Sequence, residues 1–181
     1  MALIILLIII ALVAVYFVSC QRQFVDLKEK IKNSLSNIGV EQKSRWDALL
    51  QIAKAAKSYK EYEAETLIGI AEKRAGKAPS TVEEVEASEE AFSRTLSRLL
   101  AVVESYPELK ASELYSKTMN SIDSFENKVR ISRQVYNDCV TKYNRMVKQI
   151  PSSFVASVLH YEEEKYLEFS KEIEDMPNLD L

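Results

Sequence analysis

The chain has 181 residues, with 24 Lys and Arg against 27 Asp and Glu, so its formal net charge is −3. This slightly acidic balance argues against a nucleic-acid-binding protein, which requires a basic face. With only three glycines and four prolines, long uninterrupted helices are expected. The two cysteines, Cys20 and Cys139, are too few for a disulfide framework.

Residues 1–18 contain no charged side chain. As a helix this run would be about 27 Å long, close to the roughly 30 Å hydrocarbon core of a bilayer, so we predict a transmembrane anchor. A cleaved signal is the alternative, because the segment from Val18 to Cys20 is similar to a lipoprotein cleavage site. The bulky Phe17 and the lack of positive charge before the run favour the uncleaved anchor. We interpret Cys20 as an unmodified small residue, with reversible acylation as the alternative.

Basic residues near the end of this run predict its orientation, because Lys and Arg within about 20 residues of a span favour the cytoplasmic side. None precedes the run, and four follow it: Arg22, Lys28, Lys30 and Lys32. We therefore expect the N-terminus outside and the body in the cytoplasm, with an extracytoplasmic body as the alternative. These juxtamembrane side chains either contact anionic headgroups of the bilayer or form a solvated helix face.

Apolar residues recur at helical spacing from Phe24 onward, which predicts one amphipathic helix from about Arg22 to Arg74. Unbroken, it would be about 80 Å long. Gly39 is its weakest position and the expected site of a bend. Because no turn signal separates Val18 from Phe24, we expect the anchor and this helix to be continuous.

Residues 76–81 combine Gly, Pro and Ser and predict a loop. Ser80 or Thr81 should cap a second helix, with Glu83 or Glu84 completing a capping box. The other glutamates of these opening turns suit the positive end of the helix dipole. A carboxylate metal site is the less favoured alternative.

Pro107 should end the second helix near Ser105. A turn over residues 106–111 then leads to Ser112, the expected cap of a third helix. That helix should extend to about Gln149, because its apolar residues keep helical spacing up to that point.

Pro151 separates the third helix from a short fourth helix, capped by one of the two serines that follow. From Glu162 the chain has eight acidic and two basic residues. We expect this acidic tail to be helical near Tyr166 and Phe169 and frayed afterwards.

No segment shows the alternation of a strand, so the fold class is all-α. We predict an N-terminal transmembrane helix followed by an antiparallel bundle of three long helices plus a short C-terminal helix. The expected boundaries are 1–19 for the anchor, 20–161 for the bundle and 162–181 for the acidic tail.

The third helix carries a mainly polar stripe beside an apolar seam, at spacings of three, four and seven residues. The candidate residues are Glu126, Asn127, Arg130, Arg133, Tyr136, Asn137, Tyr143 and Asn144. We favour a polar network that fixes the register of the bundle. The alternative is a groove that binds a peptide or a partner helix.

Several sequence motifs of the chain resemble those of the bacterial LemA family. Residues 105–113 (Ser-Tyr-Pro-Glu-Leu-Lys-Ala-Ser-Glu) are similar to its Tyr-Pro-x-Leu-Lys-Ala turn. The Tyr-Asn pairs at 136–137 and 143–144, with the Glu-Asn pair at 126–127 and Arg133, resemble its Glu-Asn…Arg-x-x-Tyr-Asn-x-x-Val-x-x-Tyr-Asn helix. The ending Met-Pro-Asn-Leu-Asp-Leu is similar too.

One stretch departs from the family pattern. Residues 46–52 (Trp-Asp-Ala-Leu-Leu-Gln-Ile) stand where the family has Leu-Ile-Pro-Asn-Leu-Val, so the Pro-Asn kink is lost. The resemblance implies a membrane-anchored bundle of long helices with no established biochemical activity.

Signatures of an enzyme are missing from the sequence. His160 is the only histidine, which excludes a two-His metal site, and no Gly-rich loop could hold a phosphate. We therefore predict no enzyme, no cofactor and no small-molecule substrate. The favoured function is a scaffold or adaptor beside the bilayer that contacts a protein partner through a helix face. The alternative is a self-associating, membrane-organising protein.

Overall fold

The computed structural model describes residues 1–57 and 61–168. Within these ranges the chain forms helices and no strand, which confirms the all-α prediction. The long helices are α1 (Ala2–Ala56), α3 (Val82–Glu104) and α5 (Glu113–Lys148). The shorter helices are α2 (Glu61–Ala75), α4 (Pro107–Lys110) and α6 (Ser152–Val158).

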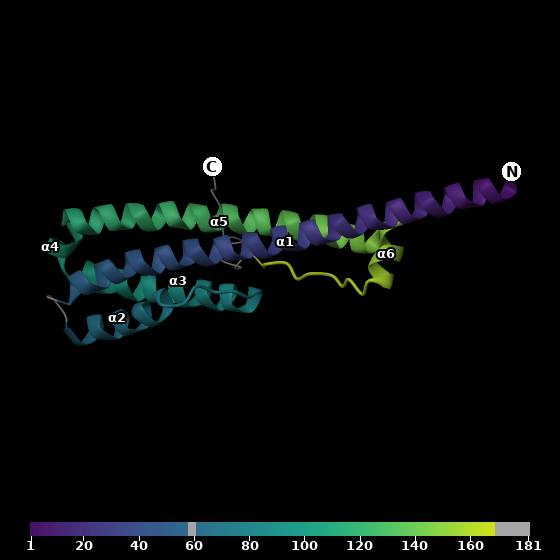
Figure 1. Ribbon diagram of the computed structural model, residues 1–181. Coiled ribbons are helices and arrows are strands. Elements are labelled where there is room, and N and C mark those ends of the chain that lie inside the picture. Colours follow the sequence, from purple (N-terminus) through teal and green to yellow (C-terminus); the bar gives the residue numbers. More distant parts are fainter. Residues whose placement is uncertain (58–60, 169–181) are drawn as a thin grey trace, which may run out of the picture.

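Helix α1 is unbroken from Ala2 to Ala56, so the predicted continuity between the apolar run and the following helix is confirmed. Its N-terminal part projects beyond the other helices (Figure 1). The large apolar side chains from Leu3 to Val18 are almost all exposed there. Among the described residues, α1 is the one helix that is long and apolar enough to cross a membrane.

The prediction of a single helix as far as Arg74 is wrong. Helix α1 ends at Ala56, and α2 packs back against it (Figure 1). The two arms meet through small buried residues, such as Ala53 on α1 and Ala71 on α2, which let the backbones approach closely. Folding back buries the apolar stripe of α2, which a straight helix would leave exposed.

Gly39, the expected site of a bend, lies inside α1 without interrupting it. A Cβ atom built on Gly39 would lie 2.5 Å from the carbonyl oxygen of Pro79. The glycine is therefore required by the close approach of the loop between α2 and α3.

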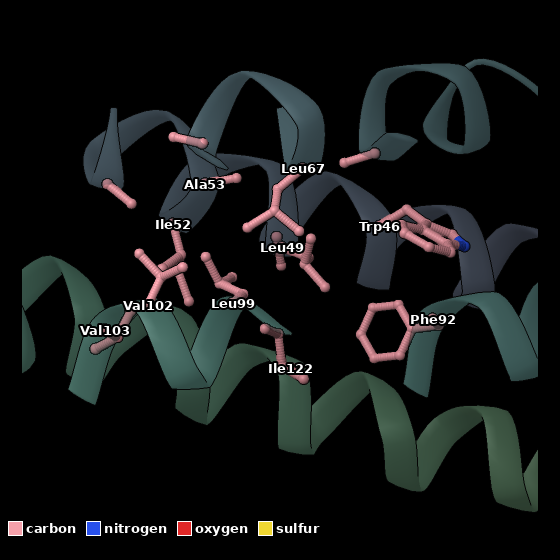
Figure 2. Close-up of a cluster of buried hydrophobic side chains, with 14 of the residues drawn as sticks. Trp46, Leu49, Ile52, Ala53, Leu67, Phe92, Leu99, Val102, Val103 and Ile122 are labelled. Carbon is pink, nitrogen blue, oxygen red and sulfur yellow. The ribbon is translucent and has the colours of Figure 1, made fainter. Parts of the chain in front are cut away.

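Helix α5 runs antiparallel to α1 along most of its length, and α2 and α3 cover the end farther from the N-terminus (Figure 1). The core has two parts. At the far end, α1, α2, α3 and α5 all contribute apolar side chains, and Trp46 packs edge-on against Phe92 with ring centroids 5.1 Å apart (Figure 2). Nearer the N-terminus, a second cluster joins α1, α5 and α6 around Phe24 and Tyr143.

The N-caps of α3 and α5 are as predicted. Thr81 accepts a hydrogen bond from the Glu84 amide, and Ser112 accepts one from the Tyr115 amide. The predicted serine cap of α6 is wrong, because its N-cap is Pro151. The hydroxyl of Ser152 instead donates back to the Met146 and Gln149 carbonyls.

After α6, the described residues 159–168 form no helix. Residues 161–168 run back along the bundle as a chain without regular secondary structure, so the predicted helix near Tyr166 is wrong (Figure 1). The expectation for Phe169 and the rest of the acidic tail lies outside the described residues. We call residues 161–168 the C-terminal strap.

Candidate functional site

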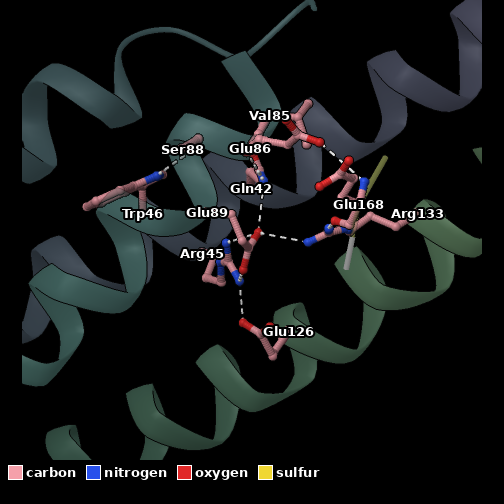
Figure 3. Close-up of polar contacts among 10 residues, drawn as sticks. All are labelled: Gln42, Arg45, Trp46, Val85, Glu86, Ser88, Glu89, Glu126, Arg133 and Glu168. Atoms are coloured by element: carbon pink, nitrogen blue, oxygen red, sulfur yellow. Dashed lines mark hydrogen bonds and ion pairs between the residues drawn. The ribbon is translucent and has the colours of Figure 1, made fainter. Parts of the chain in front are cut away.

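An ion pair is buried where α1, α3 and α5 meet (Figure 3). Arg45 on α1 is 0% exposed, and its Nη1 and Nη2 atoms donate to Glu89 Oε1 and Oε2 at 3.0 and 2.9 Å. The same guanidinium pairs with Glu126 on α5 and lies 4.0 Å from the ring centroid of Phe92. This forked geometry gives strong, direction-specific hydrogen bonds.

Two further side chains complete what we call the ionic cluster, which consists of Gln42, Arg45, Glu89, Glu126 and Arg133. Gln42 Nε2 donates to Glu89 Oε2 at 3.0 Å and to the Val85 carbonyl at 3.1 Å. Arg133 Nη1 lies 3.8 Å from the same Glu89 oxygen. Glu89 lies on α3. It accepts hydrogen bonds from Gln42 and Arg45 of α1, and its charge is close to that of Arg133 on α5.

Arg45 and Glu89 stabilise each other in the ionised state. Burial alone would raise the pKa of Glu89, but hydrogen bonds from Arg45 and its charge outweigh burial and lower that pKa. Burial alone would lower the pKa of Arg45, but its bonds to Glu89 and the charge of Glu126 raise it. The pair therefore stays charged at neutral pH, and each charge depends on the other for its compensation.

The polar stripe of α5 binds the C-terminal strap through two matched amide pairs. Asn137 Nδ2 donates to the Leu167 carbonyl, and Asn137 Oδ1 accepts from the Leu167 amide, both at 2.9 Å. Asn144 makes the same two bonds to Glu164, also at 2.9 Å. Each asparagine thus satisfies the backbone of one strap residue, as a neighbouring strand would.

The spacing of these pairs follows from helix and extended-chain geometry. The two asparagines are seven residues apart on α5, which is about 10.5 Å along a helix. Their partners are three residues apart, which is about 10 Å in an extended chain. A Tyr-Asn pair repeated after seven residues therefore matches an antiparallel extended segment.

Other contacts fix the strap to both α5 and α3. Tyr136 Oη donates to the Lys165 carbonyl at 3.0 Å, and Arg133 donates to the Glu168 carbonyl. Toward α3, the Glu168 amide donates to Glu86 Oε1 at 3.2 Å (Figure 3). Arg133 therefore connects the strap to the ionic cluster.

The second tyrosine of the repeat has a different environment. Tyr143 packs edge-on against Phe24, with centroids 5.6 Å apart, and also contacts Tyr161 at 6.5 Å. Its buried hydroxyl has no hydrogen-bond partner among the described residues. Burial, with the charge of Glu164, raises the pKa values of Tyr136 and Tyr143 to about 12.

The structure places the residues of the predicted network in four environments. Those that bond to the strap backbone are Arg133, Tyr136, Asn137 and Asn144. Glu126 pairs with Arg45 of the ionic cluster, and Tyr143 belongs to the core. Asn127 and Arg130 are exposed on α5, where Arg130 donates to Asn127 at 3.4 Å.

The predicted juxtamembrane residues lie on the exposed face of α1, just after the apolar run. All four are exposed or largely exposed: Arg22, Lys28, Lys30 and Lys32. Lys30 pairs with Asp26 at 2.7 Å, and Lys28 lies 3.7 Å from Glu164 of the strap. Cys20 is buried in the second core cluster.

Sequence reasoning missed Gln42, Arg45 and Glu89. A signal was available for α1, because buried positions recur at alternating spacings of three and four residues, as in Ile38, Gln42, Arg45, Leu49 and Ile52. Gln42 and Arg45 therefore occupy core positions of the pattern. Glu89 is one of several glutamates at the start of this helix, where the dipole alone explains an acidic residue.

In this region, buried groups of opposite charge neutralise one another. No group of three or more His, Cys, Asp or Glu in residues 1–57 and 61–168 could hold a metal ion. The buried guanidinium and its carboxylates are bonded to each other, and the asparagine amides are bonded to the strap backbone. The arrangement can hold helices and an extended peptide in fixed register.

Part of the chain is similar in sequence to magnetosome proteins. The chain is 29% identical over 77 residues to magnetosome proteins MamQ 1 and MamQ 2 of Paramagnetospirillum magneticum. It is 27% identical over 75 residues to magnetosome protein MamQ of Magnetospirillum gryphiswaldense. These matches cover 42% and 41% of the chain and 28% of each relative, so the chain corresponds to little more than a quarter of their length.

The family comparison covers much more of the chain. The sequence profile of the LemA family matches residues 34–180, which include α5 and the strap. The exposed apolar start of α1 and the magnetosome relatives indicate a membrane-associated helical protein. The chain belongs to the LemA family.

Proposed function

We propose that this protein is a single-pass, non-enzymatic membrane scaffold or adaptor, whose helical bundle contacts a protein partner through a helix face. The observation that carries the proposal is the unbroken helix α1. One helix supplies both the exposed apolar run and the buried face of the bundle. A span in this helix would therefore hold the bundle to the bilayer without a flexible linker.

The polar interior supports a structural role for the bundle. Arg45 and Glu89 are buried against each other, so their charges are not available to a substrate. Asn137 and Asn144 are similarly engaged by the strap backbone. Contact with another protein therefore falls to the outer surface.

The outward face of α5 is the best candidate for that contact. Ile131 and Val135 are exposed and four residues apart, so they lie together on one side of the helix. Asn127 lies one turn before Ile131 on the same side, and Arg130 is adjacent. Apolar side chains beside an arginine and an amide form the kind of surface that protein interfaces use.

Photo-crosslinking in cells tests this function. A photoreactive residue is placed at Ile131 in the full chain, and at the exposed Lys117 of the same helix as the matched control. We expect an adduct with a different protein that forms at position 131 and not at position 117. An adduct containing only this chain would support the alternative of self-association, and no position-specific adduct would contradict both.

The orientation is a separate part of the proposal. Arg22, Lys28, Lys30 and Lys32 follow the apolar run, which favours a cytoplasmic bundle. A reporter that is active only in the cytoplasm, fused after Leu181, should be active, and protease added outside intact cells should leave the bundle uncut. Activity of the matching outer-side reporter would reverse the orientation without affecting the anchor.

A further inference from the structure

Helix α6 exposes an apolar surface that the described part of the bundle does not cover. Ile150, Phe154 and Val158 are 78%, 68% and 65% exposed. They are spaced four residues apart at the turn between α5 and α6 and along α6 itself. We call these three side chains the α6 patch.

The opposite face of α6 packs against α1 at the end of the apolar run. Val155 and Ala156 are buried in the cluster that contains Cys20 and Phe24, and Phe17 packs against the same cluster. Figure 1 shows α6 crossing the end of the bundle transversely to α1, with the N-terminal part of α1 extending beyond it. Helix α6 therefore lies at the level where the apolar run of α1 ends.

The charges near α6 are arranged to suit a membrane surface. Arg145 and Lys148 occupy the last turn of α5, next to α6, and Arg22 is exposed on α1 at the same end. Lys148 is paired with Glu163 at 2.7 Å. The acidic strap that follows runs away from this end, along the bundle (Figure 1).

We propose that the α6 patch inserts into the interface of the bilayer that α1 spans, so that the bundle makes a second contact with the membrane. An apolar face with flanking basic residues, lying in the plane of the membrane, is the arrangement of an interfacial helix. The bilayer is the occupant because the buried face of α6 packs beside Phe17 and Cys20, at the end of the proposed span, which places the exposed patch next to that end. This inference rests on the proposed anchor.

Quenching by brominated lipids tests the contact in the full chain. Single variants Phe154→Trp, Val158→Trp, Val13→Trp and Leu114→Trp are reconstituted in phosphatidylcholine and phosphatidylglycerol vesicles, with bromines near the start of the acyl chains. Leu114 is the matched control, because it is exposed on α5 at the opposite end of the bundle. The buried Trp46 contributes the same background to every variant, and the unsubstituted chain measures it.

We expect the emission added by Phe154→Trp and by Val158→Trp to fall about twofold, because interfacial side chains lie about 5–10 Å deep, at the level of the bromines. The emission added by Leu114→Trp should not change. If Val13→Trp is quenched and neither α6 variant exceeds the Leu114→Trp control, the α6 contact is overturned and the anchor stands. If Val13→Trp is not quenched either, the anchor and this inference both fail.

Discussion

Gly39 and Gly69 both lie within helices, but their surroundings are opposite. A Cβ on Gly39 would lie 2.5 Å from the Pro79 carbonyl oxygen, whereas a Cβ on Gly69 would meet no atom within 4 Å. Gly69→Ala should therefore raise the free energy of unfolding by about 0.5–1 kcal/mol, through helix propensity. Gly39→Ala should lower it by about 1–3 kcal/mol, because the loop must move.

Unfolding of both glycine variants can be followed by circular dichroism in detergent micelles. The two substitutions add the same methyl group to a helix, so each serves as the control for the other. Equal stabilisation by both would contradict the close approach of the loop to α1.

Tyr136 and Tyr143 have the same side chain and different hydroxyl environments. Tyr136→Phe removes a bond to the Lys165 carbonyl and should cost about 1 kcal/mol. Tyr143→Phe should change stability by less than about 0.5 kcal/mol, because its hydroxyl has no partner among the described residues. A larger loss of stability in Tyr143→Phe would contradict the absence of a hydrogen-bond partner for this hydroxyl within the described part of the chain.

The raised pKa values of these tyrosines predict a loss of stability in alkali. The folded chain keeps the two protons up to about pH 12, whereas an unfolded tyrosine loses its proton near pH 10. The contribution is therefore complete below about pH 10 and lost as the pH rises toward 12. Each Tyr→Phe variant should flatten this decline when denaturant unfolding is measured across that range, and an unchanged slope would contradict the assignment.

At the scale of elements, the strap depends on asparagines rather than on its own secondary structure. Asn137→Ala removes both bonds to Leu167, and Asn144→Ala removes both bonds to Glu164. Hydrogen exchange of the strap amide that loses its acceptor should become about 10- to 100-fold faster, a loss of about 1–3 kcal/mol of local protection. Asn127→Ala is the control, because Asn127 is exposed and bonds only within α5 among the described residues.

Unchanged protection of both strap amides in the two asparagine variants would show that the strap is held by other contacts. Faster exchange throughout the bundle, including α3, would show instead that the strap is required for the whole fold.

Helix ends were predictable from sequence where local chemistry sets them. Thr81 and Ser112 cap their helices through their own side chains, and α3 and α5 end three residues before Pro107 and Pro151, respectively. The reversal after Ala56 was not predictable from periodicity, because the apolar spacing is the same in a straight helix and in a helical hairpin. The strap has no internal pattern, because the α5 side chains that bond its backbone lie 20 to 35 residues earlier in the chain.

The candidate site was predictable on α5 and not beyond it. Polar residues at helical spacing mark one stripe of α5, and in the structure four of them bond to the strap backbone. Which residue meets which depends on three-dimensional packing, so Glu126 pairs with Arg45 rather than with its helical neighbour Arg130. Similarly, nothing local distinguishes Glu89 from the other glutamates of α3.

At the scale of the whole molecule, the ionic cluster connects three helices and, through Arg133, the strap. Arg45→Met should cost about 3–5 kcal/mol, because Glu89 would keep a buried charge without its main partner. Adding Glu89→Met should recover most of that loss. Arg94→Met is the control and should leave the unfolding midpoint unchanged, because the Arg94–Glu90 pair is exposed.

Denaturant unfolding in micelles measures the stability of the unsubstituted chain and of these three variants. If the double variant were as unstable as Arg45→Met, uncompensated charge would not be the cause, and the guanidinium stacking on Phe92 would become the better explanation.

The absence of any break in α1 between its apolar run and Ala56 makes the helix a lever. From Cys20 to Ala56 it extends about 55 Å. Transmembrane helices are tilted by about 20° on average, and a tilt of that size at the proposed span would swing the far end of the bundle sideways by about 20 Å. A change in bilayer thickness that alters the tilt would thus be amplified into a movement of the α1–α2 turn, far from the lipid itself.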